Sequence, residues 1–168
     1  TQSVRDLVAE SGYPGMKVLQ FAFGSGSDNE YLPHNYTPNS VVYTGTHDNE
    51  TLMQYLECTE EHVRNHIREY MNRPHASNGE LCENLIWMAI SSVGKYCMIP
   101  LQDYLGLGKE ARMNYPSTLG HNWEWRVRKE QLTHDLASYI AHMTGLSYRW
   151  RIDPPKEEET NETDTENE

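Results

Sequence analysis

The sequence has few cysteines, few phenylalanines and no long apolar run. Its three cysteines, Cys58, Cys82 and Cys97, are an odd number and form no CxxC pair. This argues against a disulfide framework and a thiolate metal site, and it favours reduced thiols in a cytoplasmic protein. No stretch approaches the roughly 18 apolar residues of a membrane span, and the first residues lack the pattern of a secretory signal. The chain does not begin with Met, so we expect a fragment or a processed product.

Basic residues are also scarce, because 14 Lys and Arg stand against 25 Asp and Glu, for a formal net charge of −11. The C-terminal segment DPPKEEETNETDTENE holds eight of the acidic residues and one lysine. Such a segment buries too little apolar surface to fold, so we expect residues 152–168 to be a disordered acidic tail. The lack of a basic stripe argues against nucleic acid or an anionic membrane as a partner.

The most informative stretch is residues 41–51, VVYTGTHDNET, in which an apolar, β-prone run ends in hydrogen-bonding residues. In α/β enzymes, catalytic side chains stand at the C-terminal ends of strands. His47 and Asp48 are therefore the first candidate functional residues. A plainer interpretation is a strand that runs into a turn, with Asp48 and Asn49 capping the next helix.

Hydrophobic spacing predicts three strands with nearly continuous apolar character, which is typical of parallel strands buried on both faces. These strands are residues 15–23, 40–46 and 96–101. The predicted helices are residues 4–11, a helix from an N-cap at Thr59 to before Pro74, a helix from the Ser77–Glu80 capping box to near Gly94, and residues 132–144 with Gly145 as the stop.

Strands of this kind, separated by crossovers, indicate a parallel sheet in an α/β fold. Three strands cannot close a barrel, and a complete (β/α)₈ barrel takes roughly 250 residues. The chain is therefore either a small open α/β unit or the last part of a barrel.

Five segments resemble, in this order, the C-terminal portion of the 4-α-glucanotransferases, the amylomaltase or disproportionating-enzyme family (glycoside hydrolase family 77). They are GMKVLQFAF, YLPHNY, VVYTGTHDNET, PLQDYLGLGKEARMN and NWEWRV. The resemblance implies that residues 1–151 are the last part of a (β/α)₈ TIM barrel, about strands six to eight with their helices. It also implies that the N-terminal part of the barrel is missing from this chain.

The resemblance further implies a retaining double displacement that transfers α-1,4-glucan segments between malto-oligosaccharides, with no cofactor and no metal. One carboxylate forms a covalent glucosyl-enzyme, and a second acts as acid and then as base. In the family these two lie on the fourth and fifth strands, upstream of Thr1, so we expect this chain alone to be inactive. Asp48, in the THDN motif, matches the third carboxylate, which stabilises the transition state. His47 would bind the same sugar.

Three further residues are predicted to contact the glucan. Asn114 stands in the ARMN motif of the resemblance. Members of the family commonly have an aspartate after the FAF strand, where this chain has Gly24, and Asp28 in the following loop is the candidate replacement. Trp123 offers a flat apolar face to sugar C–H groups. Core packing is the alternative for Trp123 and for Trp125.

For several other polar residues, the sequence fits both a functional and a structural role. Arg112 could reach a sugar, or form a salt bridge within its loop. Asp103, at the end of the third predicted strand, could belong to the site or cap the next turn. His62 and His66 have the i, i+4 spacing of a metal pair, but a solvated helix face is the favoured interpretation.

Two other classes of function also fit the sequence. A metal-dependent barrel hydrolase would take its ligands from His47, Asp48, His34 and His121. A non-catalytic chain would bind glucan weakly, or would only pack against the missing half of the barrel. In that case we expect exposed apolar strand edges and aggregation.

Overall fold

The computed structural model describes residues 2–149, so the domain boundary predicted after residue 151 and the acidic tail predicted for residues 152–168 lie outside the described residues. None of the helices in the described part is long and apolar enough to cross a membrane. The helices are α1 (Gln2–Ser11), α2 (Leu52–Cys58), α3 (Glu61–Tyr70), α4 (Asn78–Ile90), α5 (Leu101–Tyr104) and α6 (His134–Leu146), and the strands are β1 (Gly15–Val18), β2 (Ser40–Tyr43) and β3 (Tyr96–Met98).

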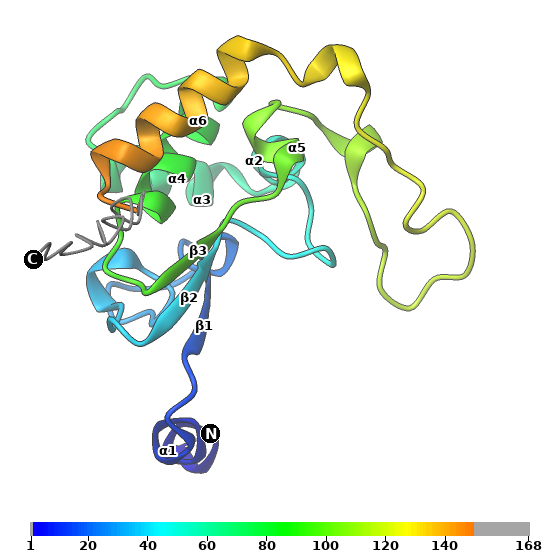
Figure 1. Ribbon diagram of the computed structural model, residues 1–168. Coiled ribbons are helices and arrows are strands. Elements are labelled where there is room, and N and C mark those ends of the chain that lie inside the picture. Colours follow the sequence, from blue (N-terminus) through cyan, green and yellow to red (C-terminus); the bar gives the residue numbers. More distant parts are fainter. Residues whose placement is uncertain (1, 150–168) are drawn as a thin grey trace, which may run out of the picture.

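The three strands form one parallel sheet in the order β1-β2-β3. Val42 in the central strand is paired with Lys17 of β1 on one side and with Cys97 of β3 on the other. Figure 1 shows α2, α3 and α4 gathered on one side of the sheet, while α1 extends away from the body below it. The predicted α/β class with a parallel sheet is confirmed.

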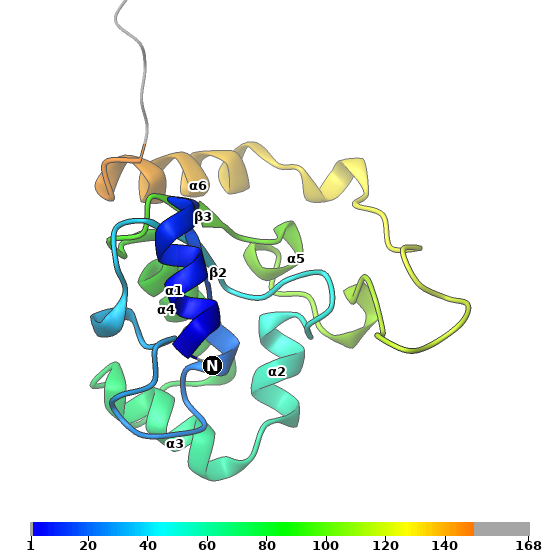
Figure 2. The ribbon, with the colours of Figure 1, turned by 90° about the horizontal axis from the view of Figure 1, so that it is seen from below.

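The core lies between the sheet and these helices. Val42 is fully buried at its centre, because the helices turn their apolar faces toward β2. The fully buried side chains from α2, α3 and α4 include Leu52, Leu56, Ile67, Leu81, Leu85, Ile86 and Ala89. Figure 2 shows that the chain between α5 and α6 leaves this core as a long projecting loop.

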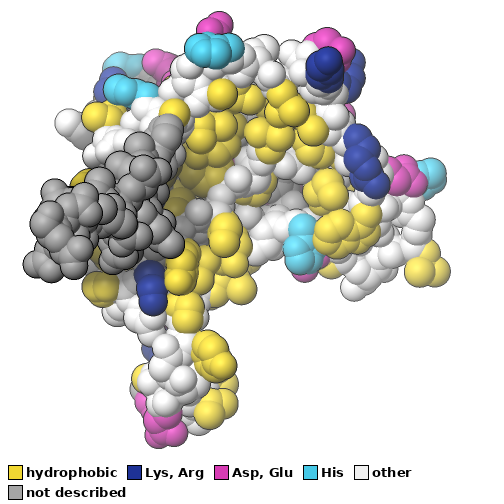
Figure 3. Space-filling view, in the orientation of Figure 1, with side chains coloured by type: hydrophobic (Ala, Val, Ile, Leu, Met, Phe, Trp, Pro, Cys, Tyr) yellow, Lys and Arg dark blue, Asp and Glu magenta, His cyan; other side chains and the backbone are white. Residues whose placement is uncertain are grey.

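The opposite face of the sheet is open. Met16, Tyr96 and Met98 are 57%, 49% and 52% exposed, although each lies in a strand. Figure 3 shows hydrophobic side chains gathered in the hollowed middle of the molecule. The prediction that the strands are buried on both faces is wrong for the described residues, because no described segment covers this face.

The strands are shorter than predicted. β1 ends at Val18, where the chain turns into a 3₁₀ helix (Leu19–Phe21) that brings Leu19 into the core. β2 ends at Tyr43, because the following residues form a turn rather than a ladder. β3 ends at Met98, since Pro100 lacks the N–H that a ladder needs and instead begins α5 as its N-cap.

The capping box predicted for α4 is confirmed, since Glu80 N–H donates to Ser77 Oγ and the Glu80 side chain accepts from Ser77 N–H. The N-cap predicted at Thr59 is wrong, because Thr59 instead ends α2, a helix that the sequence patterns did not predict. The stop predicted at Gly145 is also misplaced. It lies inside α6, which continues to Leu146 and begins after the N-cap Thr133.

Candidate functional site

The polar turn after β2 is held together by its own side chains. Asn49 Oδ1 accepts from the backbone N–H of Thr46 at 2.9 Å and from its hydroxyl at 2.8 Å. Asp48 N–H donates to Thr46 Oγ1 at 3.3 Å. These bonds leave the side chains of His47 and Asp48 about half exposed, at 54% and 49%. Neither Asp48 nor Asn49 caps the next helix, because Thr51 does so.

Two buried side chains anchor this turn to the protein. Gln20 Nε2 donates to the carbonyl of Glu50 at 2.9 Å, at the end of the turn. Asp103 accepts hydrogen bonds from the Thr44 hydroxyl at 2.6 Å and from Leu52 N–H at 2.8 Å. One carboxylate therefore binds the residues that precede and follow the turn. Asp103 is therefore a supporting residue inside the protein and also serves the first amide of α2.

The pKa of Asp103 reflects this position. Burial raises it to about 6, although the hydrogen bonds from Leu52 N–H and the Thr44 hydroxyl act in the opposite direction by stabilising the carboxylate. The charged form thus has two donors but little access to water. The pairing of Asp103 with the turn is consequently sensitive to mildly acidic pH.

The segment 112–115 packs against the turn. Asn114 Nδ2 donates to Asp48 Oδ1 at 2.6 Å, and Asn114 N–H donates to the His47 carbonyl at 3.1 Å. Arg112 donates to the Asp48 carbonyl at 2.9 Å and pairs with Glu50 at 2.6 Å. The structure thereby brings together Asp48 and Asn114, and it shows that Arg112 makes a salt bridge with the turn.

Trp123 covers the histidine of the turn. Its ring centroid lies 4.9 Å from that of His47, with a tilt of 41°, and His47 Nε2 lies 3.3 Å from Asp48 Oδ1. Trp123 has a positive φ of 64° and is 50% exposed, so it is not a core residue. Its backbone N–H donates to the Met113 carbonyl at 2.6 Å, which fixes this unusual conformation. Trp125 is half-buried.

Asp28 lies in the long connection between β1 and β2. Its loop is tied to α3 through His34, whose ring nitrogens lie 2.9 Å from the Tyr70 hydroxyl and 2.8 Å from the Ser27 carbonyl. Within residues 2–149, no hydrogen bond, ion pair or ring contact joins Asp28 to the turn of Asp48. Its role as a glucan contact stays a prediction.

The histidines do not assemble a metal site in the described part of the chain, where no group of three or more His, Cys, Asp or Glu side chains could hold an ion. Both ring nitrogens of His34 are engaged. His121 has a 94% exposed side chain. The i, i+4 pair diverges, since His66 Nδ1 lies 2.9 Å from the Phe23 carbonyl while His62 lies 3.2 Å from Glu60 on the surface.

Sequence reasoning overlooked Gln20 and Glu50, which hold the turn. The available signal was an uncharged polar residue, Gln20, inside the largely apolar run GMKVLQFAF. It is buried, and such a side chain needs a partner. The site as a whole offers a carboxylate acceptor, an amide donor and an aromatic face, which together suit a neutral ligand rich in hydroxyl groups.

Comparisons with known proteins place this geometry in context. A sequence profile described as 4-alpha-glucanotransferase matches residues 1–133. The chloroplastic/amyloplastic 4-alpha-glucanotransferase of Solanum tuberosum is 43% identical over 127 residues, which are 76% of this chain and 22% of the potato protein. The 4-alpha-glucanotransferase of Clostridium butyricum is 41% identical over 151 residues, which are 87% of this chain and 30% of that protein.

The fold is similar to that of the amylomaltase from Streptococcus agalactiae in complex with acarbose, with a TM-score of 0.83 and 32% identity. The match covers 90% of this chain and 30% of that one. This chain thus spans about a fifth to a third of the length of the relatives it matches, between 21% and 31%.

Proposed function

The chain belongs to the 4-alpha-glucanotransferase family, and from this we propose that the protein transfers α-1,4-glucan segments between malto-oligosaccharides by a retaining double displacement. The observation that carries the proposal is the hydrogen bond of 2.6 Å between Asn114 and the half-exposed carboxylate of Asp48. The binding of acarbose by the similar streptococcal amylomaltase supports glucans as the ligand class.

In this proposal, β1, β2 and β3 are the sixth, seventh and eighth strands of a (β/α)₈ barrel, within residues 1–151. Their parallel order and the turn at the C-terminal end of β2 support it, because barrel enzymes carry their catalytic groups at that end. The open face with Met16 and Met98 would then be part of the barrel interior. In the complete barrel, the other five strands would close around this face and cover it.

Asp48 is the transition-state stabiliser of the proposal. Its carboxylate would accept hydrogen bonds from the hydroxyls of the sugar at the cleavage point, and these bonds strengthen as positive charge develops on the ring. The Asn114 amide holds Oδ1 at 2.6 Å, so the second oxygen, Oδ2, remains for the sugar. Fixing the carboxylate before the substrate arrives reduces the cost of orienting it during the reaction.

His47, Asn114 and Trp123 would complete the sugar contacts. The tilted stack of His47 on Trp123 orients the imidazole as a hydrogen-bonding group beside Asp48 and leaves part of the Trp123 ring open to sugar C–H groups. Asp28 is a more distant glucan contact in this proposal. No cofactor is invoked, and the cytoplasmic location expected from the cysteines stays a prediction.

The nucleophile and the acid/base carboxylate would come from the other strands of the barrel. The test therefore replaces the matching segment of the Streptococcus agalactiae amylomaltase with residues 1–151 and measures glucose release from maltotriose. We expect Asp48→Asn to lower kcat by about 10²- to 10³-fold, the usual effect of removing one preorganised transition-state contact.

The matched control is Asp135→Asn, an exposed carboxylate in the first turn of α6. It should leave kcat unchanged, because its charge lies outside the proposed site. Activity of the Asp48→Asn hybrid within a few-fold of the parent hybrid would refute the role of Asp48. A bound metal, or sensitivity to chelators, would favour the hydrolase alternative.

A further inference from the structure

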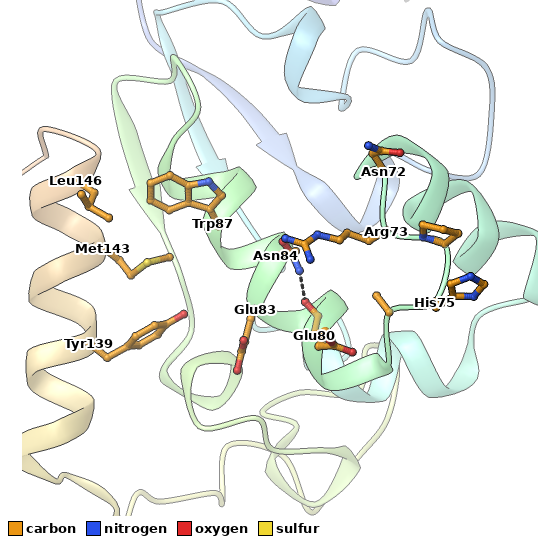
Figure 4. A pocket seen from close by; sticks show the side chains of 12 residues that line it. Asn72, Arg73, His75, Glu80, Glu83, Asn84, Trp87, Tyr139, Met143 and Leu146 are labelled. Atoms are coloured by element: carbon orange, nitrogen blue, oxygen red, sulfur yellow. Dashed lines mark hydrogen bonds between the residues drawn. The ribbon is translucent and has the colours of Figure 1, made fainter.

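A second cavity lies away from the proposed site, between α4, the segment 72–76 and α6, with a volume of about 650 Å³ (Figure 4). It shares no lining residue with the turn that carries Asp48. Neither the family resemblance nor the proposed reaction assigns it a role. Its size is within the usual range of ligand sites, roughly 300–1,000 Å³.

Aromatic side chains line the cavity from two elements. Trp87 of α4 and Tyr139 of α6 are each 37% exposed, although both are large and apolar. Neither the Trp87 indole N–H nor the Tyr139 hydroxyl has a hydrogen-bond partner among the described residues. The Tyr139 ring also packs edge-to-face against the Tyr104 ring, with a distance of 6.4 Å between the ring centroids. The cavity therefore offers supported aromatic surface together with unused polar tips.

Polar groups face these rings from the other side. The Arg73 side chain is exposed and extends toward Asn84 in Figure 4. Among the described residues, neither the Arg73 nor the Glu83 side chain forms a hydrogen bond or a salt bridge, although the nearby Arg73 charge contributes to lowering the pKa of Glu80. Asn84 Nδ2 donates to the Glu80 carbonyl at 2.6 Å, which fixes the amide and leaves its oxygen free to accept. Donors and acceptors thus remain available around the cavity.

The charges of the lining oppose one another. Arg73 is positive and Glu83 negative, while the Glu80 carboxylate is occupied by the amide and hydroxyl of Ser77 in the capping box. Glu83 would repel an anionic ligand, and Arg73 would repel a cationic one. A neutral ligand with many hydroxyl groups could pair with both residues and place its C–H faces on the rings.

We propose that this cavity is a second binding site for an α-1,4-glucan chain, remote from the reaction. Trp87 supplies the stacking face, and Arg73, Glu83 and Asn84 bind hydroxyl groups. The choice of an α-1,4-glucan over other neutral saccharides rests on the proposed function, whereas the aromatic and polar lining is independent of it. Such a site would hold one part of a long glucan while another part occupies the site of Asp48.

The test is a titration of the full chain with maltoheptaose, followed by NMR of the tryptophan indole N–H signals. Four tryptophans give few signals, and single replacements assign them. We expect the Trp87 signal to shift with added maltoheptaose. Trp87→Ala should lower the affinity at this site about tenfold, as read from the neighbouring Asn84 amide signal, because one stacking face is lost.

Arg73→Ala is the second variant, since this side chain is exposed and forms no hydrogen bond or salt bridge among the described residues. It should weaken the same shift while the remaining spectrum stays unchanged. Trp123→Ala is the matched control, because it removes a comparably exposed tryptophan at the other site and should leave the Trp87 shift intact.

The outcomes separate this proposal from the proposed function. Shifts at Trp123 without any at Trp87 would overturn the second site and leave the reaction proposal standing. Shifts at Trp87 that persist when Asp48 and Trp123 are replaced support the second site, even if the hybrid enzyme shows no role for Asp48. An equal shift at Trp87 on adding inorganic phosphate in place of maltoheptaose would show an anion site and would overturn the proposal.

Discussion

The Asp103 carboxylate and the Thr44 hydroxyl meet at 2.6 Å inside the protein, at the base of the turn that presents Asp48. The same carboxylate accepts from Leu52 N–H, so a single buried group ties the end of β2 to the start of α2. The geometry of the exposed site thus depends on a residue that no ligand in that site would touch.

The free energy of unfolding should depend on pH through the protonation of Asp103. Its pKa is raised to about 6 in the folded chain, while an aspartate of the unfolded chain titrates near about 4. Between these values the folded state binds more protons, so the contribution of Asp103 to stability is present below pH about 4 and is lost as pH rises through about 6. The unfolding free energy of the wild type, minus that of Asp103→Asn, should fall over this range by at most about 1.4 kcal/mol per pH unit.

Urea unfolding of both proteins at several pH values measures this difference, and the other carboxylates cancel because both chains share them. A difference that stays constant with pH would contradict the expectation.

Gly45→Ala should destabilise the turn. A Cβ at this position would lie 2.6 Å from Gln20 Nε2, which would push the amide away from the Glu50 carbonyl. We expect a loss of about 1–3 kcal/mol in the free energy of unfolding, as overpacking typically gives. Gly24→Ala is the control, because a Cβ there meets open space. Combining Gly45→Ala with Gln20→Ala should cost less than the sum of the two single changes, and strict additivity would argue against the clash.

Asn114→Ala should lower the kcat of the hybrid transferase about tenfold or more, because a hydrogen bond to a charged group is lost and Asp48 is no longer held. Glucose release from maltotriose measures this change. Asn65→Ala removes an exposed amide on α3 and should have no effect on kcat. Equal activity of the two variants would show that Asn114 does not position Asp48.

Residues 1–168 alone should not disproportionate maltotriose. The proposed reaction needs two further carboxylates, and the resemblance places both on strands outside this chain. The glucose assay, run beside the hybrid enzyme as a positive control, measures this. Glucose release by the chain alone at a rate near that of the hybrid would overturn the assignment of the missing groups.

The open face of the sheet should make the chain self-associate. Met16, Tyr96 and Met98 present apolar surface in adjacent strands, and β3 has an unpaired edge in the described part. Light scattering at increasing protein concentration should show association that Met98→Lys reduces. Leu119→Lys is the control, because this side chain is fully exposed but lies in the loop beyond α5, away from the sheet. A wild-type chain that stays monomeric would contradict this expectation.

Features that depend on neighbours along the chain could be predicted from the amino-acid sequence. The capping box of Ser77 and Glu80, the parallel α/β class and the polar turn at His47 and Asp48 follow from spacing and propensity, because hydrogen bonds over a few residues do not need distant partners. The motifs also pointed to the family. The ends of the strands were harder to predict from the sequence. The residue at which β1 leaves the ladder depends on how Leu19 packs in the core.

The contacts between polar residues far apart in the chain could not be predicted, because they depend on its three-dimensional packing. Asn114 and Asp48 are 66 positions apart, and their contact at 2.6 Å arises because the chain beyond α5 folds back onto the turn. The structure also showed that Asp103 supports this turn. Burial and long-range hydrogen bonds settle such roles, and both depend on how β2, α2 and α5 pack rather than on local sequence.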